Sequence, residues 1–263
     1  MIEISAAMVK ALREKTGQGM MDCKRALSEC GGDVEAAIEW LRKKGLAQAE
    51  RKAARATSEG LVAAHTVDGG GAMVEVACET DFCARNDQFK KMVRQVAELA
   101  AAEPDGPVGE TEHIQAAVQA CFNKINENMR YARGAKISAP TIGHYIHHNG
   151  KVGVLVGIEG EIAPELLNDL CMHIAFADPM AIATDQIPAE VVEREKRLAA
   201  EQAVESGKPA AVIEKIVAGK TAKFLASNAL LEQPFVKDEK KKVKQILGPA
   251  KVTGFVRFQV GQE

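Results

Sequence analysis

The spacing of the hydrophobic residues changes along this chain, and this change restricts the fold more than any other feature. As far as about residue 45, apolar residues recur at the spacing of helices, in runs that end at Gly17 and Gly31. From Leu61 the spacing becomes that of β-strands, interrupted by a strand-free stretch rich in Ala, Glu and Lys from Pro188 to Leu230. Helices and strands arranged in such blocks predict an α+β protein of several parts.

The first 45 residues predict three short helices. Ser5 is expected to cap the first helix, Gly31-Gly32 to end the second and Asp33 to cap the third. A bundle of this size buries little apolar surface, so we expect a small docking unit or a cap on a larger part. The Ala-rich, charged stretch from Leu46 to about Ser58 predicts a helical linker. We therefore predict a three-helix docking domain with its linker over residues 1–55.

The middle of the chain predicts a two-part core of β-hairpins and helices. The first hairpin is expected around Asp68 to Gly71 and the second around Asn149-Gly150. The expected elements are strands from Leu61 to Val67, Ala72 to Cys78, Ile137 to His148 and Val152 to Ile158, helices from Asn86 to Ala102, from Thr111 to Arg130 and from Pro164 onward, and a loop from Pro104 to Gly109. We predict a core N-subdomain over residues 56–140 and the first part of a core C-subdomain over residues 141–187.

The stretch over residues 188–230 predicts an antiparallel helical hairpin with a break at Ser206 to Pro209. The narrow apolar stripe of its second arm suits two helices packed on each other, as in a coiled coil. The chain is then expected to return to the C-subdomain over residues 231–263, through a charged helix from Lys237 to Leu247 and a final strand from Thr253 to Val260. The hairpin is therefore predicted to be an insertion in the core.

Composition and motifs exclude several classes of protein. The chain has 263 residues, a formal net charge of -2 and a pI near 6.3, so it lacks the basic footprint of a nucleic-acid-binding protein. Six scattered cysteines without a CxxC pair predict reduced, buried thiols. Glycine-rich segments lack the spacing of nucleotide-binding loops, and no nucleophile, base and orienting group stand together. We predict no enzyme activity, no catalytic residue, no cofactor and no metal.

The histidines have ordinary structural explanations. Alternation along a strand places His144 and His148 on one face and His147 on the other, which disfavours a metal site. His173 is expected to be a satisfied, partly buried histidine. No export signal is expected either, because Met1 to Ser5 lead directly into a charged amphipathic segment, and the apolar runs fall short of the roughly 20 residues of a membrane span. We expect a soluble, cytoplasmic protein.

Three segments together resemble one known family. The segment from Leu12 to Leu27, LREKTGQGMMDCKRAL, resembles the N-terminal signature of elongation factor Ts, the guanine-nucleotide exchange factor of elongation factor Tu. Thr80-Asp81-Phe82 resembles the exchange motif of that family. Gly207-Lys208-Pro209 and Gln233-Pro234-Phe235 resemble its insertion and the return from it. The resemblance runs in order from about residue 3 to residue 260.

This resemblance implies a ubiquitin-associated-like three-helix N-terminal bundle, a two-part α+β core and a protruding coiled-coil hairpin. It implies a translation elongation factor that binds elongation factor Tu with GDP bound, disturbs its Mg²⁺ and phosphate site, and stimulates GDP release so that GTP can bind. The partner would be elongation factor Tu, and this chain itself would bind no nucleotide, nucleic acid or membrane. A homodimer through the hairpin stays open, because an exposed hairpin can pair with a second copy or with nothing.

The exchange motif is predicted at Thr80, Asp81, Phe82 and Cys83. From the residues alone, Phe82 could be a core aromatic, and Asp81 could cap a helix after the turn. The resemblance implies instead that Asp81 and Phe82 reach the Mg²⁺ site of the partner and shift its ligands. The two roles of Asp81 are compatible if the cap holds the turn in shape.

The predicted partner-binding residues are Arg13, Met20, Met21, Ile125, His147 and His148. From the residues alone, Met20 and Met21 either form an adaptable docking surface at a helix start or pack in the core. The resemblance implies that they contact the GTP-binding domain of elongation factor Tu, with Arg13 beside them. It also implies that Ile125 and one of the two histidines contact the partner near Phe82.

The alternative function is that of an RNA- or ribosome-associated interaction protein without exchange activity. The run from Lys237 to Lys244 is the basic segment that could support it. Asp238 and Glu239 interrupt this run, and no aromatic side chains stand nearby for stacking on bases. A solvated helix face explains the run better.

Overall fold

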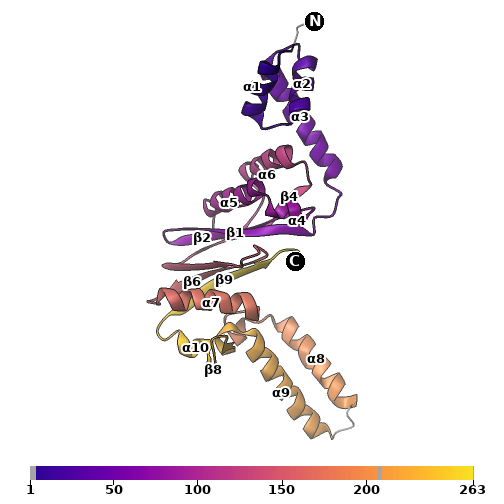
Figure 1. Cartoon of the computed structure of the whole chain (residues 1–263). Coiled ribbons are helices and arrows are strands. Elements are labelled where there is room, and N and C mark those ends of the chain that lie inside the picture. The colour runs from indigo at the N-terminus through magenta and orange to yellow at the C-terminus, as the bar shows by residue number, and fades with distance from the viewer. Residues whose placement is uncertain (1–3, 206–208, 263) are drawn as a thin grey trace.

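The computed structural model describes residues 4–205 and 209–262 of the chain. The protein is α+β, as predicted, and its parts follow one another along a long axis (Figure 1). Three helices lie at one end, two β-sheets with their covering helices occupy the middle, and a helical hairpin extends from the other end.

The first three helices form a bundle: α1 (Ala6–Thr16), α2 (Met20–Glu29) and α3 (Val34–Lys52). The predicted N-caps are confirmed. The Ser5 side chain accepts a hydrogen bond from the Met8 amide, and the Asp33 side chain accepts one from the Ala36 amide. The core of the bundle includes Val9, Leu12, Leu27 and Leu41.

The predicted linker helix is not a separate element. α3 continues without a break to Lys52, and only residues 53–58 connect it to the first strand. Beyond Lys44, which pairs with Asp22 of α2, the helix leaves the bundle and lies against α6 (Glu112–Ile125), so a continuous apolar stripe is not needed there. Gly45 permits this close approach, because a Cβ at that position would collide with the side chain of Asn123.

The first sheet has the strand order β1-β2-β4-β3, and all of its neighbours are antiparallel. Its strands are β1 (Glu59–Val67), β2 (Gly70–Cys78), β3 (Gly106–Val108) and β4 (Met129–Ser138). The short helix α4 (Asp81–Arg85) follows β2, and α5 (Asp87–Ala101) packs with α6 over the outer face. The hairpin of β1 and β2 is confirmed, and Gly69 supplies the positive φ of 75° at its turn.

Three predictions in this half are wrong. The expected loop from Pro104 to Gly109 contains β3, which is too short to show a strand period. The expected helix from Thr111 to Arg130 ends at Ile125, because Asn126 adopts a left-handed conformation with a φ of 61°, and β4 starts soon after. The expected strand from Ile137 to His148 is divided at Pro140, so its two parts belong to different sheets.

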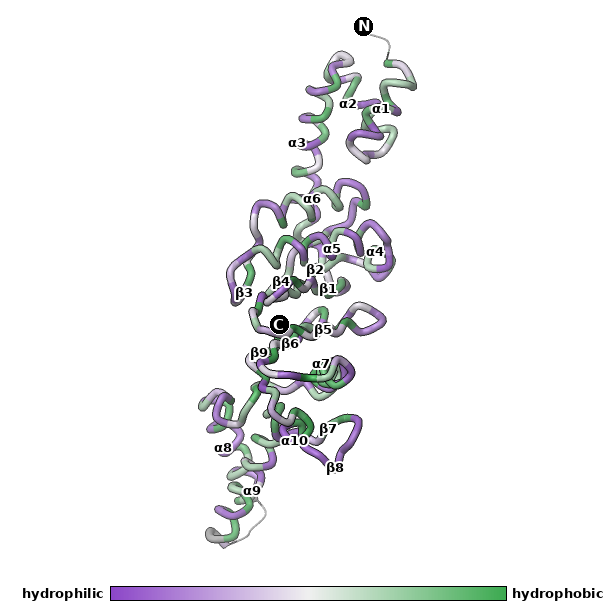
Figure 2. Tube along the Cα trace, turned by 90° about the vertical axis from the view of Figure 1, so that its left-hand side faces the viewer, coloured by the Kyte–Doolittle hydropathy of each residue, from purple (hydrophilic) through white to green (hydrophobic). Residues whose placement is uncertain are grey.

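The second sheet has the strand order β5-β6-β9: β5 (Thr141–Ile146), β6 (Val152–Glu159) and β9 (Lys251–Gln259). α7 (Pro164–Ala177) covers its outer face, with Pro164 in the first helical turn as predicted. The inner faces of the two sheets meet through Val62, Met73, Leu155 and Phe258. Figure 2 shows hydrophobic residues gathered along the central strands where the sheets meet.

The predicted helical hairpin is confirmed by α8 (Ala189–Glu205) and α9 (Ala210–Asn228), which pack on each other and project from the core (Figure 1). Of the predicted break at Ser206 to Pro209, only Pro209 is described, and it precedes α9 as its N-cap residue. The residues from Ser206 to Lys208 lie outside the described residues. Short 3₁₀ turns at Thr184–Gln186 and Leu230–Glu232 join the hairpin to the second half of the core.

The predicted charged helix from Lys237 to Leu247 is mostly wrong. The segment forms β8 (Asp238–Lys242), paired with β7 (Pro234–Phe235), and only α10 (Val243–Ile246) is helical. Val243 and Leu247 are buried one helical turn apart, which explains the helical period at the end of the segment. The final strand is confirmed by β9. Among the described helices, none has the length and apolar character needed to span a bilayer.

Candidate functional site

The predicted exchange motif lies at the start of α4, immediately after β2. The Thr80 hydroxyl accepts a hydrogen bond from the Cys83 amide at 3.1 Å, so Thr80 is the N-cap of this short helix. The alternative that Asp81 caps this helix is therefore wrong. Asp81 lies in the first turn, where its carboxylate pairs with Arg85 at 3.1 Å one helical turn later.

Phe82 points away from the core, and its side chain is 79% exposed. The alternative that it is a core aromatic is wrong. The next two residues, Cys83 and Ala84, face the core instead. Exposing a phenylalanine forgoes roughly 1.5–3 kcal/mol of burial free energy, which a binding partner can recover.

Cys83 is buried beneath α4 beside Cys78, and both thiols are free. A hydrogen bond with Cys78, together with burial, raises the pKa of Cys83 far above its usual value. Burial also raises the pKa of the neighbouring Cys121 to about 11. The thiols of Cys83 and Cys121 therefore stay neutral near pH 7. All three cysteines are buried and pack as small apolar groups, as predicted for buried structural cysteines.

The strand register brings other predicted residues to the same end of the first sheet. Cys78, at the end of β2, pairs with Glu59 on one side and with Met129 on the other. The turn before Met129 follows directly on Ile125, whose half-buried side chain packs against the core below. Ile125 and Phe82 therefore lie at one end of the sheet although 43 residues separate them.

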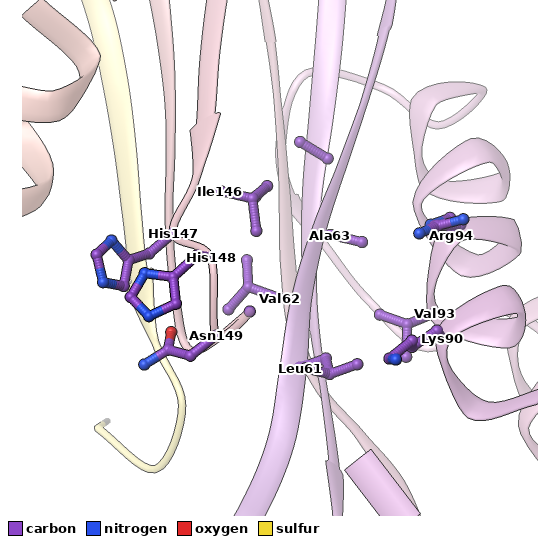
Figure 3. A pocket seen from close by; sticks show the side chains of 12 residues that line it. Leu61, Val62, Ala63, Lys90, Val93, Arg94, Ile146, His147, His148 and Asn149 are labelled. Carbon is purple, nitrogen blue, oxygen red and sulfur yellow. The ribbon is translucent and has the colours of Figure 1, made fainter. Parts of the chain in front are cut away.

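The turn between β5 and β6 is fastened to this same end. The Val62 amide of β1 donates to the Gly150 carbonyl at 2.8 Å, and Lys151 Nζ donates to the Gly60 carbonyl at 2.9 Å. A groove of about 400 Å³ lies between the turn and α5, with β1 at its base, and it is lined by Val62, Val93, Arg94, His147 and His148 among others (Figure 3). The predicted histidines thus line a groove beside β1, a strand that also contacts α4.

The two histidines differ in their surroundings. The hydroxyl of Tyr145 and Nδ1 of His147 share a hydrogen bond at 2.8 Å, and the His147 ring is half-buried. His148 is exposed, and its ring centroid lies 4.2 Å from that of His147. The expectation that the two lie on opposite faces of a strand is wrong, because β5 ends at Ile146 and the chain turns there.

The predicted docking residues lie on the N-terminal bundle. Met20 is 51% exposed and Met21 is 73% exposed at the start of α2, and Arg13 of α1 is also exposed. The alternative that the methionines pack in the core is wrong. The bundle rests on the end of α6 that leads to Ile125, because Gly17 lies against the side chain of Lys124.

A polar network that the sequence analysis missed supports α4. Glu127 accepts hydrogen bonds from the Thr80 hydroxyl at 2.9 and 3.1 Å. The Asn128 amide donates to Glu79 at 2.6 Å, and Arg55 pairs with the same carboxylate at 3.3 Å. The amide and Arg55 lower the pKa of Glu79. No local pattern reveals these contacts, because their partners lie 24 to 49 residues apart.

The remaining polar candidates have structural roles. His173 is buried, and its Nδ1 accepts a hydrogen bond from the Val236 amide. Its Nε2 therefore carries the hydrogen and donates to the side-chain oxygen of Gln233 at 3.0 Å. Burial lowers the pKa of His173. In the basic run, Lys242 and Lys244 both pair with Glu232 at 2.7 Å. Within residues 4–205 and 209–262, no group of three or more His, Cys, Asp or Glu side chains could hold a metal ion.

The fold and this site define an α+β protein with an N-terminal helical bundle, an inserted helical hairpin and an exposed aromatic side chain on a capped helix start. The sequence model of the Elongation factor TS family matches residues 79–262. Elongation factor Ts of Bartonella bacilliformis is 43% identical, covering 99% of this chain and 94% of its own length. The proteins of Rhodospirillum rubrum and Thioalkalivibrio sulfidiphilus are 44% and 45% identical, covering 100% and 98% of this chain and 94% and 92% of their own lengths.

The chain belongs to the elongation factor Ts family, which confirms the resemblance noted in its sequence. Its role is that of a translation elongation factor. The family consists of nucleotide exchange factors, which fits a role without bond-making chemistry of its own.

Proposed function

We propose that this protein binds elongation factor Tu in its GDP-bound form and stimulates the release of GDP, so that GTP can bind in its place. The observation that carries this proposal is Phe82, a 79% exposed aromatic side chain on a helix start that is capped and fastened to the core. Family membership supplies the partner, since the relatives are elongation factor Ts proteins.

The mechanism rests on thermodynamic linkage. A translational GTPase holds its nucleotide through backbone donors, a lysine and a Mg²⁺ ion that bridges phosphate oxygens and protein ligands. An exchange factor weakens nucleotide binding only by the factor by which nucleotide weakens its own binding. The protein must therefore bind vacant elongation factor Tu more tightly than the GDP-bound form.

Phe82 and Asp81 are the groups that would disturb the Mg²⁺ site. A phenylalanine has only two side-chain torsions, so it can be pressed into another protein at a low cost in conformational entropy. The ion pair with Arg85 orients the Asp81 carboxylate, and a negative charge brought close to the Mg²⁺ site competes with its existing ligands. Thr80 and Cys83 act beneath them, as the cap and as the buried support of the same turn.

The other predicted residues would hold the partner in place. Met20 and Met21, with Arg13 beside them, present an apolar surface at the start of α2 that suits the GTP-binding domain of elongation factor Tu. Ile125 would contact the partner next to Phe82. Of the two histidines we assign the contact to His148, because it is exposed whereas His147 is half-buried and bonded to Tyr145.

The proposal divides the work among the parts of the chain. Residues 1–55 dock, residues 56–140 carry the exchange motif, and residues 141–187 and 231–263 support the histidine turn from the second half of the core. The hairpin over residues 188–230 is proposed as a further interaction surface. It could pair with the hairpin of a second copy of this chain to form a homodimer. We place this work in the cytoplasm, where elongation factor Tu acts.

The test is the release of labelled GDP from elongation factor Tu in excess unlabelled GDP, with and without this protein. The proposal predicts that substoichiometric amounts raise the release rate, and that the rate saturates as the protein concentration increases. An unrelated protein at the same concentration is the control. An unchanged release rate at micromolar concentrations of this protein would overturn the proposal.

A second test concerns nucleotide binding by this protein itself. Equilibrium dialysis of the protein alone against GDP should show no stoichiometric uptake.

A further inference from the structure

The turn between α6 and β4 connects three parts of the molecule through three consecutive residues. Lys52 Nζ, at the end of α3, donates to the Asn126 backbone carbonyl and, at 2.9 Å, to the Asn126 side-chain oxygen. Glu127 accepts both hydrogen bonds from the Thr80 hydroxyl. The Asn128 side chain donates to the carbonyl of Arg55 at 2.8 Å, and its amide donates to Glu79. The turn is thus bonded to α3, to the cap of α4 and to the two short segments that join these helices to the first sheet.

The turn itself is well fixed, so it can serve as an anchor. Asn126 ends α6 in a left-handed conformation, and its amide donates to the Phe122 carbonyl at 2.7 Å. Lys52 also lies 5.9 Å from the centre of the Phe122 ring, near the negative end of the helix. Asn128 is buried, with only 7% of its surface exposed, and Met129 begins a strand in the middle of the sheet.

The contact between Glu127 and Thr80 controls the direction of the Thr80 hydroxyl. A hydroxyl has one donor and two acceptor positions. When Glu127 accepts the hydrogen bond that the Thr80 hydroxyl donates, the lone pairs of the hydroxyl oxygen point toward the Cys83 amide and accept the hydrogen bond that caps α4. α4 has only five residues, so this cap and the burial of Cys83 and Ala84 together hold its position on the core. The direction of Phe82, one residue inside α4, follows from the direction of the helix.

We infer that Glu127 is a positioning residue for exchange: it directs the Thr80 cap and thereby holds Phe82 in the orientation that enters the partner. This inference rests on the proposed exchange function. Glu127 acts through Thr80 and α4 rather than by touching the nucleotide site of the partner. Its loss should lower the maximal stimulated rate of GDP release and leave the affinity for the partner nearly unchanged, because the docking surface of Met20 and Met21 is untouched.

The experiment compares Glu127→Ala with Glu127→Gln. The maximal stimulated rate and the half-saturating protein concentration are measured from labelled-GDP release, and thermal unfolding checks the fold. We expect Glu127→Ala to lower the maximal rate by up to about fivefold, the effect that complete loss of a helix cap would have, with a half-saturating concentration within about twofold of the original protein. Glu127→Gln should restore most of the rate, because its amide oxygen still accepts from the Thr80 hydroxyl.

Thr80→Val tests the same hydrogen bond from the other side, in case Glu127→Ala does not fold. It removes the hydroxyl while it keeps the shape, and it should lower the maximal rate at least as much. Glu127→Ala added to Thr80→Val should cause little further loss, because the hydroxyl that Glu127 directs is already absent. Thr111→Val is the matched control, since Thr111 caps α6 in the same way but has no contact with α4 among the described hydrogen bonds. This control should leave the maximal rate within about twofold.

Each outcome decides for or against the role of Glu127. A maximal rate for Glu127→Ala equal to that of the original protein would overturn the inference. So would a loss confined to the half-saturating concentration, or an equal loss in Thr111→Val, which would indicate general destabilisation. If the original protein does not accelerate release at all, the proposed function fails. A third outcome is that the original protein accelerates release, Phe82→Ala does not, and Glu127→Ala is as active as the original protein. In that case the proposed function stands and only the role of Glu127 fails.

Discussion

Two exposed apolar surfaces of this protein differ in how they are held. The α4 surface consists of Phe82, on a helix whose cap is bonded to Glu127. The α2 surface consists of Met20 and Met21, on a helix whose N-cap is Gly19 and makes no side-chain cap bond. Both surfaces are well exposed, at 79% for Phe82 and 73% for Met21.

The difference indicates two tasks. A methionine side chain has three torsions and adapts to the shape that it meets, so the α2 surface suits docking. A phenylalanine on a fixed helix keeps its direction, so the α4 surface suits the displacement of groups inside the partner. Docking energy that is the same for GDP-bound and vacant partner lowers the half-saturating concentration, whereas contacts made only with the opened site raise the maximal rate. Changes in the α2 surface should therefore affect mainly the half-saturating concentration, and changes in the α4 surface mainly the maximal rate.

The largest effect is expected for Phe82→Ala. Truncating an aromatic anchor at the centre of an interface costs roughly 2–4 kcal/mol, so the maximal stimulated rate of GDP release should fall by about 30-fold or more. The fold should be intact, with a free energy of unfolding changed by less than about 0.5 kcal/mol, because Phe82 is exposed. Stopped-flow release of fluorescent GDP measures the rate. A Phe82→Ala protein that stimulates release normally would remove the α4 surface from the mechanism.

A smaller effect of another kind is expected when Met20 and Met21 are both changed to alanine. The half-saturating concentration should rise by about tenfold, as the loss of two exposed contacts predicts, while the maximal rate stays within about twofold. A titration of this variant in the same release assay gives both values. A maximal rate that falls as far as in Phe82→Ala would mean that the two surfaces do not differ in task.

A pH effect is expected in the second half of the core, away from both surfaces. His173 is buried and neutral there, and burial lowers its pKa below 6.5. Its neutral form therefore contributes stability that is fully present above about pH 6.5 and is lost as the pH falls from that value toward the lowered pKa, by at most about 1.4 kcal/mol per pH unit.

The control for this pH effect is His173→Gln, measured by urea unfolding at a series of pH values. The variant should be less stable at pH 7.5, since His173 bonds both Gln233 and Val236, but its stability should fall less between pH 6.5 and 5. Parallel curves for the two proteins would show that His173 does not titrate on unfolding.

The smallest effect is expected for Phe176→Ala. Phe176 is 80% exposed on the last turn of α7, as exposed as Phe82, but it lies in the second half of the core beside Pro234 and Val236. If the support of Phe82 by the capped helix α4 matters more than exposure alone, Phe176→Ala should change the maximal rate and the half-saturating concentration by less than about twofold. It also serves as the matched control for Phe82→Ala. An equal loss in the two variants would show that exposure of a phenylalanine, rather than its support, decides the effect.

The elements that the sequence predicted well are those set by neighbouring residues. The caps at Ser5 and Asp33 and the turn at Gly69 depend on contacts within a few positions. The errors lie where distant pairing decides. β4 continues a sheet that began 70 positions earlier. β8 forms a strand in a segment whose helical pattern, at Val243 and Leu247, lies after the strand ends.

The candidate site divides in the same way. The residues Thr80 to Cys83 could be identified from their order alone, through the resemblance to a family. Whether Phe82 faces the core or the solvent could not be predicted, because in a helix of five residues either side can be buried. Glu127 could not be found at all, because its partner lies 47 positions away and nothing in either segment specifies the other.

The central claim is that this protein prefers elongation factor Tu without nucleotide. The most direct measurement is the pair of dissociation constants of this protein for elongation factor Tu, one for the vacant form and one for the form saturated with GDP, in the same buffer and with Mg²⁺ present. We predict tighter binding to the vacant form, by the same factor by which this protein weakens the binding of GDP. Equal affinities for the two forms would contradict the claim, because a protein that binds both forms equally does not shift the equilibrium between them.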